Sequence, residues 1–147
     1  MSCIEAKDIM YPRVSLPAKT GGHEVVQKLM CPYPGLPVIN ENQEVIGIVS
    51  EYDVLNALKE GRTISEFSAE SIMSCGHAEH GVCSSPVTVQ ANTPIEKIAD
   101  LMFALSFTVL PVVNGKCLIG LITRKSVINA MAEKGFWHEH EFRKRTP

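Results

Sequence analysis

The chain has 147 residues, of which 45% are hydrophobic and 20% are charged, and its formal net charge is −2. This composition is that of a globular protein, and the length suits one compact domain or two small units that share a core. The charge balance argues against the broad basic surface by which proteins bind nucleic acid.

Membrane insertion and secretion are not expected either. The longest apolar run, residues 107–113, is interrupted by Thr108 and Pro111 and is far shorter than a membrane span. No basic segment followed by an apolar stretch opens the chain, so no secretory signal is visible. The five cysteines lack the density of a disulfide scaffold. We therefore expect a soluble cytoplasmic protein with reduced thiols.

The first part of the chain alternates segments typical of strands and helices. Apolar residues fall at helical spacing after His23, and Pro32, Pro34 and Gly35 end that helix. Two short segments that follow are β-branched and apolar on both sides, which is typical of buried strands. The predicted elements are, in chain order, a lead-in helix over 1–10, a strand over 13–16, a helix over 23–31, strands over 36–39 and 45–49, and a helix from Ser50 to Gly61.

The second part of the chain repeats the first. The leucine-proline pair at 36–37 recurs at 110–111, and Gly47 recurs as Gly120, 73 positions further on. Internal repetition of this kind indicates copies of one structural unit, and each copy is too small to be stable alone. The sequence therefore predicts an α+β fold in which two β-α-β-β-α repeats pack against each other.

The second copy differs from the first by an insertion. Its lead-in, residues 69–73, is followed by a long loop over 75–86 before the next strand, 87–89. Thr93, Pro94 and Glu96 then form a strong helix start. The predicted domain boundaries are 1–61 for the first repeat with its lead-in helix, 62–68 for a linker, 69–134 for the second repeat and 135–147 for a tail.

The repeated motif resembles the cystathionine β-synthase-type regulatory domain, or CBS domain. The matching features are a leucine-proline-valine segment, then a hydrophobic-glycine-hydrophobic segment that ends in a hydroxyl residue, and an aspartate three residues later. The resemblance covers residues 6–134. It implies a pseudo-twofold pair, called a Bateman module, that binds AMP, ADP, ATP or S-adenosylmethionine between the repeats. It also implies a homodimer that senses or regulates, with an unidentified effector protein as a possible partner.

The candidate ligand residues of the first copy gather around the junction of its last strand and helix. A helix N-terminus suits phosphate, and the Asp53 carboxylate can accept hydrogen bonds from the two hydroxyls of a ribose. The resemblance implies that Ser50 contacts phosphate or ribose and that adenine lies against three apolar residues. The implied set comprises Val14, Leu36, Pro37, Gly47, Ile48, Ser50 and Asp53. A capping box is the alternative role of Ser50 and Asp53, and it needs no ligand.

The corresponding junction of the second copy reads Thr123-Arg124-Lys125-Ser126. Ser126 stands where the motif has aspartate, and a hydroxyl cannot accept from both hydroxyls of a ribose. Arg124 and Lys125 are candidates for phosphate contacts, with a solvated helix surface as the alternative. We therefore expect two unequal sites, of which the one at Asp53 is the better.

The inserted loop offers a second kind of site. Cys75, His77, His80 and Cys83 supply the ligand number and types of tetrahedral zinc, although their spacing does not match the usual paired pattern. A polar loop without metal and a redox-active thiol pair are the alternatives.

The sequence contains no recognisable catalytic set of nucleophile, base and orienting residue, so we expect no enzyme and no required cofactor. Three hypotheses remain. The first is a regulatory module that binds an adenine nucleotide, the second a dimerisation or interaction module without a ligand, and the third a metal or redox sensor.

Overall fold

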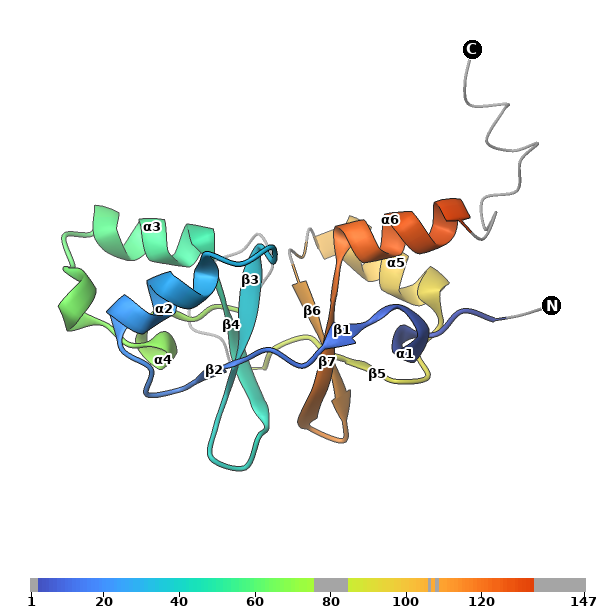
Figure 1. The fold of residues 1–147 in the computed structure, drawn as a ribbon, viewed down its shortest axis with the longest axis horizontal. Helices are drawn as coiled ribbons and strands as arrows, with labels where there is room; N and C mark the ends of the chain where they lie inside the picture. Colours follow the sequence, from blue (N-terminus) through green and yellow to red (C-terminus); the bar gives the residue numbers. More distant parts are fainter. Residues whose placement is uncertain (1–2, 76–84, 106, 108, 134–147) are drawn as a thin grey trace, which may run out of the picture.

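The structure is a computed structural model that describes residues 3–75, 85–105, 107 and 109–133. Two units lie side by side, and each consists of a small sheet with helices packed on it (Figure 1). The predicted tail over 135–147 and most of the inserted loop lie outside the described residues.

The first unit has a three-stranded sheet with the order β2-β3-β4. Strands β2 and β3 are parallel, and β3 and β4 form an antiparallel hairpin. The predicted order of strand, helix, strand, strand and helix is confirmed. Its elements are β2 (Leu16–Pro17), α2 (Gly22–Leu29), β3 (Gly35–Ile39), β4 (Val45–Ser50) and α3 (Glu51–Lys59).

The second unit repeats this topology, with β5 parallel to β6 and β6 antiparallel to β7. Both hairpins have a register shift at the same place, between Val38 and Ile39 in the first and between Val112 and Val113 in the second. The predicted pair of pseudo-equivalent α+β repeats is therefore confirmed. The elements are β5 (Val89–Gln90), α5 (Ile95–Leu105), β6 (Val109–Asn114), β7 (Cys117–Thr123) and α6 (Arg124–Glu133).

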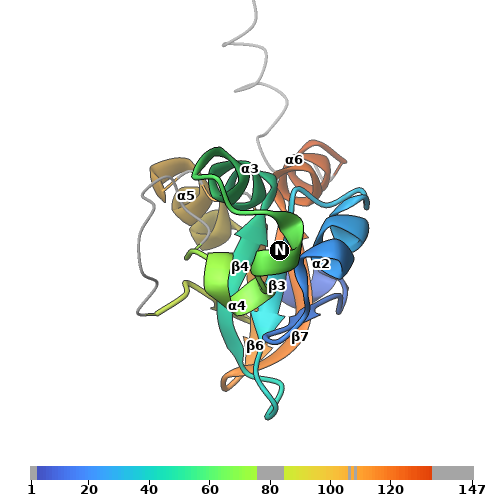
Figure 2. The same ribbon diagram turned by 90° about the vertical axis from the view of Figure 1, so that its left-hand side faces the viewer.

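The lead-in segments are exchanged between the two units. Helix α1 (Ala6–Ile9) and strand β1 (Tyr11–Pro12) pack on the second unit, where β1 pairs with the edge of β7. Helix α4 (Ala69–Ile72), which follows the short 3-10 helix η1 (Ile64–Glu66), packs on the first unit. Figure 1 shows α1 beneath α5 and α6, and Figure 2 shows α4 beside α2.

The two hydrophobic cores record the same exchange. Ala6 is fully buried in the core of the second unit, and Ala69 is fully buried in the core of the first. Backbone hydrogen bonds anchor both helices: Ala6 N–H donates to Thr93 O at 2.9 Å, and Ala69 N–H donates to Thr20 O at 2.8 Å. Each repeat is therefore completed by a segment that precedes the other repeat in the sequence.

The repeated glycines are the points at which these lead-ins cross the strands. A Cβ on Gly47 would lie 2.5 Å from Met73 Sδ, and a Cβ on Gly120 would lie 2.6 Å from Met10 Sδ. Atoms cannot approach so closely, so a side chain at either glycine would force its neighbours to move. The hydrophobic-glycine-hydrophobic segment thus has a packing role in both copies.

The hairpin loops of the two units also meet. Val45 N–H donates to Lys116 O at 3.1 Å, and Leu118 N–H donates to Gln43 O at 3.0 Å. The two hairpins project together toward the lower edge in Figure 1. These bonds and the exchanged lead-ins join the repeats into one body.

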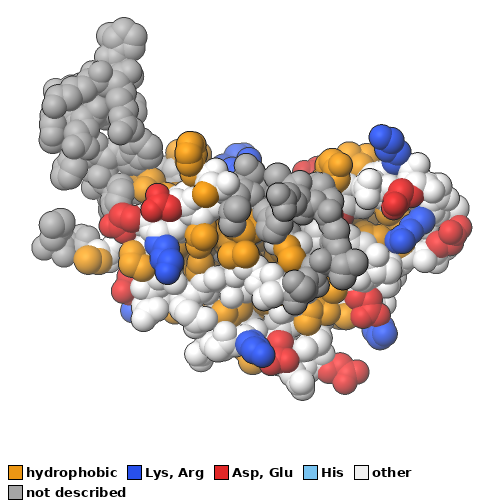
Figure 3. Space-filling model, turned by 180° about the vertical axis from the view of Figure 1, so that it is seen from behind, with side chains coloured by type: hydrophobic (Ala, Val, Ile, Leu, Met, Phe, Trp, Pro, Cys, Tyr) orange, Lys and Arg blue, Asp and Glu red, His pale blue; other side chains and the backbone are white. Residues whose placement is uncertain are grey.

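The surface carries charges of both signs. Seen from behind, Lys and Arg side chains are interspersed with Asp and Glu over the described part of this face (Figure 3). Within the described ranges, none of the helices has the length and hydropathy needed to cross a bilayer.

Several boundaries differ from those predicted. The lead-in helix was expected over 1–10 but forms only over Ala6–Ile9, because Met10 already has an extended backbone and Pro12 follows. The strand expected over 13–16 begins only at Leu16, and the preceding pair Tyr11–Pro12 is a strand of the other sheet. Both differences arise because the lead-in crosses from one unit to the other.

Candidate functional site

The first junction is a complete capping box. Ser50 ends β4, and its backbone N–H donates to Asp53 Oδ2 at 2.8 Å while Asp53 N–H donates to Ser50 Oγ at 3.3 Å. Both residues are buried, with exposed fractions of 7% and 6%. Such a cap stabilises a helix by about 1 kcal/mol. The alternative role of these two residues is therefore present in the structure.

Asp53 has a further contact across the exchanged lead-in. Ser50 Oγ donates to Asp53 Oδ2 at 2.9 Å, and Ser74 Oγ donates to the same oxygen at 3.1 Å. Ser74 directly follows the α4 lead-in, and its backbone pairs in both directions with Ile48 at 2.8 Å. One carboxylate oxygen thus links the start of α3 to the segment that leads into the second repeat.

The other candidates of the first copy have structural roles in the described residues. Leu36 and Ile48 are fully buried, and Pro37 is buried in the middle of β3. Val14 is half-buried against the core of the first unit, and Gly47 lies against Met73. None of these five lines the pocket described below.

The second junction has the same cap built from two hydroxyls. Thr123 N–H donates to Ser126 Oγ at 2.9 Å, and Ser126 N–H donates to Thr123 Oγ1 at 3.3 Å. Ser126 Oγ in turn donates to Thr123 O at 2.7 Å. Thr123 and Ser126 are buried, whereas Arg124 and Lys125 are exposed.

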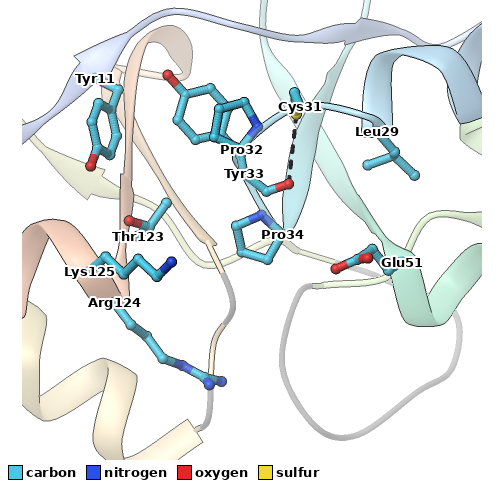
Figure 4. A pocket seen from close by; sticks show the side chains of 10 residues that line it. All are labelled: Tyr11, Leu29, Cys31, Pro32, Tyr33, Pro34, Glu51, Thr123, Arg124 and Lys125. Atoms are coloured by element: carbon cyan, nitrogen blue, oxygen red, sulfur yellow. Dashed lines mark hydrogen bonds between the residues drawn. The ribbon is translucent and has the colours of Figure 1, made fainter.

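A pocket of about 500 Å³ opens beside this second junction, and both units line it. Its volume is within the range of small-molecule sites. Figure 4 shows the α6 side of the pocket facing the segment between α2 and β3. Three predicted site residues, Thr123, Arg124 and Lys125, line it. The remaining lining residues are Tyr11, Leu29, Cys31, Pro32, Tyr33, Pro34 and Glu51.

The α6 side of the pocket is positively charged. Arg124 and Lys125 are the first two residues of α6, and the first turn of this helix contains no acidic residue. The helix dipole adds partial positive charge there. Arg124 Nε donates to Phe107 O at 2.8 Å, which fixes the root of its guanidinium group. The first turn of α3, in contrast, carries Glu51 and Asp53.

Two tyrosines and two prolines form another part of the pocket wall. The rings of Tyr11 and Tyr33 lie 5.2 Å apart at an interplanar angle of 47° (Figure 4). The free thiol of Cys31 donates to Tyr33 O over 3.6 Å. The Pro-rich segment at 31–35 predicts the end of a helix. It does not predict that the residues of this segment face the other repeat.

The metal hypothesis gains no support from the described residues. Among them, no group of three or more His, Cys, Asp or Glu side chains is placed to hold a metal ion. His77, His80 and Cys83 lie outside the described residues. Cys75 is disulfide-bonded, whereas Cys3, Cys31 and Cys117 are free. The expectation of reduced thiols is therefore wrong for Cys75, because it rested only on the low density of cysteines in the sequence.

The duplicated units, their exchanged lead-ins and a pocket lined by both define a tandem pair of small α+β modules. The model of the CBS domain matches this chain twice, over residues 6–60 and 80–133. The chain therefore belongs to the CBS domain family, as a tandem pair.

Relatives in sequence and structure agree with this assignment. CBSX2, a chloroplastic CBS domain-containing protein of Arabidopsis thaliana, is 31% identical over 116 residues, which are 65% of this chain and 48% of that protein. The protein MJ1404 of Methanocaldococcus jannaschii is 28% identical over 102 residues, 67% of this chain and 24% of its length. The chain thus spans a quarter to a half of these relatives.

Two solved structures show the same fold. The crystal structure of CBSX2 in complex with AMP has a TM-score of 0.71 and 28% identity, and the match covers 88% of this chain and 97% of that one. The CBS domain pair of protein MJ0100, in complex with 5′-methylthioadenosine and S-adenosyl-L-methionine, has a TM-score of 0.71 and 20% identity over 90% of this chain and 99% of that one.

Proposed function

We propose that this chain is a regulatory, non-catalytic module that senses an adenine nucleotide, namely AMP, ADP, ATP or S-adenosylmethionine. The observation that carries the proposal is the pocket of about 500 Å³ between the units, which is lined by two cationic side chains and two tyrosines. The AMP complex of the relative CBSX2, 28% identical to this chain, supports the choice of ligand.

The charges of the pocket suggest how the nucleotide lies in it. Phosphate would be placed against Arg124 and Lys125, because charge-assisted hydrogen bonds and the positive end of α6 favour an anion there. The base would pack on the tyrosine pair, since aromatic rings give large contact areas with preferred geometry. The cleft at Asp53, which the sequence favours, stays a proposal for a second site.

Ligand-dependent stabilisation tests this function. Thermal-shift and calorimetric titrations of AMP, ADP, ATP and S-adenosylmethionine should show stability that rises with ligand concentration, by about 2.7 kcal/mol at 100 times Kd. Lys125→Ala should weaken nucleotide binding about tenfold, because it removes one charge-assisted hydrogen bond. Lys97→Ala, an equal charge change on the exposed surface of α5, is the matched control.

Two results would count against the proposal. Absence of concentration-dependent stabilisation by all four compounds would favour a ligand-free interaction module. Equal affinity of wild type and the Lys125→Ala variant would exclude this pocket as the site. Metal analysis of protein purified without a histidine tag separates the third hypothesis, the metal sensor at Cys75, His77, His80 and Cys83.

We also propose that the chain forms a homodimer. Large apolar side chains are exposed at pseudo-equivalent positions, 73 residues apart: Met30 and Phe103 at 78% and 91%, and Leu55 and Ile128 at 65% each. Figures 1 and 2 show α3, α5 and α6 along the same edge of the molecule. A surface repeated about a pseudo-twofold axis can meet a second copy of itself, and exposed apolar patches mark interfaces.

Light scattering after size-exclusion chromatography tests the dimer. The double variant Leu55→Glu, Ile128→Glu should elute as a monomer, because it places charges in the proposed interface. Asn42→Glu at the tip of the first hairpin should leave the mass unchanged. A monomeric wild type, or a dimeric double variant, would refute this interface.

Regulation further requires that the nucleotide bind one arrangement of the dimer, or of its complex with an effector protein, more tightly than another. The cytoplasmic location stays a prediction from the sequence, and the relative CBSX2 is chloroplastic.

A further inference from the structure

The two strand–helix junctions have the same cap but a different number of acceptor atoms. In the first, Asp53 supplies a carboxylate with two oxygens, and the cap hydrogen bonds from Ser50 go to Oδ2. In the second, Ser126 has a single oxygen. The second junction, which has fewer acceptor atoms, is the one that borders the pocket.

The hydroxyl of Ser126 is fully engaged within the cap. Its proton is donated to Thr123 O at 2.7 Å, and its oxygen accepts from Thr123 N–H at 2.9 Å. Ser126 is 8% exposed, so water does not offer it alternative partners readily. A hydroxyl supplies one donor and two acceptor lone pairs. At most one weak acceptor position remains, and two neighbouring sugar hydroxyls need two.

We infer that this pocket selects its nucleotide by phosphate and base and is indifferent to the 2′-hydroxyl of the sugar, so that a ribonucleotide and its 2′-deoxy form bind equally well. This inference rests on the proposed function. It follows because discrimination for a hydroxyl arises from buried polar groups that its loss would leave unpaired. Ser126 is satisfied by Thr123 whether or not a hydroxyl is present.

Among the described residues that line the pocket, Glu51 alone carries a carboxylate, and it must be considered as an alternative acceptor. It lies across the pocket from Thr123 and Lys125 (Figure 4) and is exposed to solvent. Because water can replace a sugar hydroxyl at an exposed carboxylate, that contact gives little discrimination.

Isothermal titration with AMP and 2′-deoxy-AMP tests the inference on the full chain. The relevant binding event is the one that Lys125→Ala weakens. For that event we expect the two Kd values to agree within about twofold in wild type. In Ser126→Asp, which copies Asp53, AMP should bind about tenfold more tightly than 2′-deoxy-AMP, because the carboxylate adds one charged acceptor oxygen beyond the one that the cap occupies. Ser126→Ala is the control and should keep the wild-type ratio.

The outcomes separate this inference from the function on which it rests. If neither nucleotide binds, the proposed function fails. If AMP binds at the Lys125-sensitive site at least fivefold more tightly than 2′-deoxy-AMP in wild type, the function stands and the inference is overturned. In that case Glu51→Gln shows whether Glu51 is the acceptor. The ratio of the two Kd values in wild type tests the inference even if the Ser126→Asp variant fails to fold.

Discussion

Because the lead-ins are exchanged, substitution of the two repeated glycines should destabilise the fold by different amounts. A Cβ on Gly120 would lie 2.6 Å from Met10 Sδ and 2.8 Å from Tyr11 O, whereas the three atoms nearest to a Cβ on Gly47 all belong to the Met73 side chain. Methionine can change rotamer, but Tyr11 O belongs to the backbone of β1, which pairs with β7. Gly120→Ala therefore forces the backbone apart, and Gly47→Ala displaces one side chain.

The expected magnitudes follow from these distances. Ordinary contact between heavy atoms is about 3.5 Å, so β1 must move by about 0.7 Å in Gly120→Ala. Overpacking of this kind costs about 1–3 kcal/mol, and we place Gly120→Ala near about 3 and Gly47→Ala near about 1 kcal/mol. For a domain of this size the Tm falls by about 2–4 °C per kcal/mol. Gly120→Ala should thus lower Tm by about 6–12 °C, and Gly47→Ala by about 2–4 °C.

Double variants give the sharper test, with urea denaturation as the assay. In a Met73→Ala background, Gly47→Ala should cost less than about 0.5 kcal/mol, because truncation removes the clashing Sδ and Cγ. In a Met10→Ala background, Gly120→Ala should still cost at least about 1 kcal/mol, because Tyr11 O remains. Equal costs in the two backgrounds would refute the reasoning.

Two further predictions concern the cap and the surface. Asp53→Ala should lower the free energy of unfolding by about 2 kcal/mol, because three donors on Ser50 and Ser74 lose their acceptor. Urea denaturation measures this loss. The nucleotide affinity of the same folded variant reports whether Asp53 also binds ligand. Lys19→Ala should leave Tm unchanged within error in a thermal scan, although the hydrogen bond and charge of Glu70 raise the pKa of Lys19. The reason is that Lys19 is largely solvated and Glu70 is partly exposed, and water screens such a surface pair.

The architecture was predictable because duplication is visible in the sequence. The spacing of Gly47 and Gly120 and the apolar strand segments before them predicted two copies of one unit, and both copies are present. The capping residues predicted the starts of α3 and α5 to within one residue. Strand segments and helix starts depend on residues that are close in the sequence, so they can be predicted from the sequence alone.

The exchange of lead-ins could not be predicted from periodicity. A segment such as 6–10 has the same apolar pattern whichever unit it covers, and only the tertiary contacts of Ala6 and Met10 decide between them. One signal was available: a methionine in each lead-in recurs together with a glycine in each hairpin. The pocket residues Tyr11 and Tyr33 were missed for the same reason, since they come from segments that the sequence assigns to turns and connections.

The exchange has a consequence for how the pocket can report its occupancy. Tyr11 reaches the pocket on β1, which is held by β7 of the second unit, while Tyr33 comes from the first unit and Lys125 from α6. A ligand that contacts all three therefore bridges both units and one exchanged lead-in. Its binding free energy favours the arrangement in which these segments are close, and any partner that prefers another arrangement must compete with it. Under the proposed function, occupancy of the pocket would thereby be coupled to the relative position of the repeats, through residues that local sequence reasoning could not place.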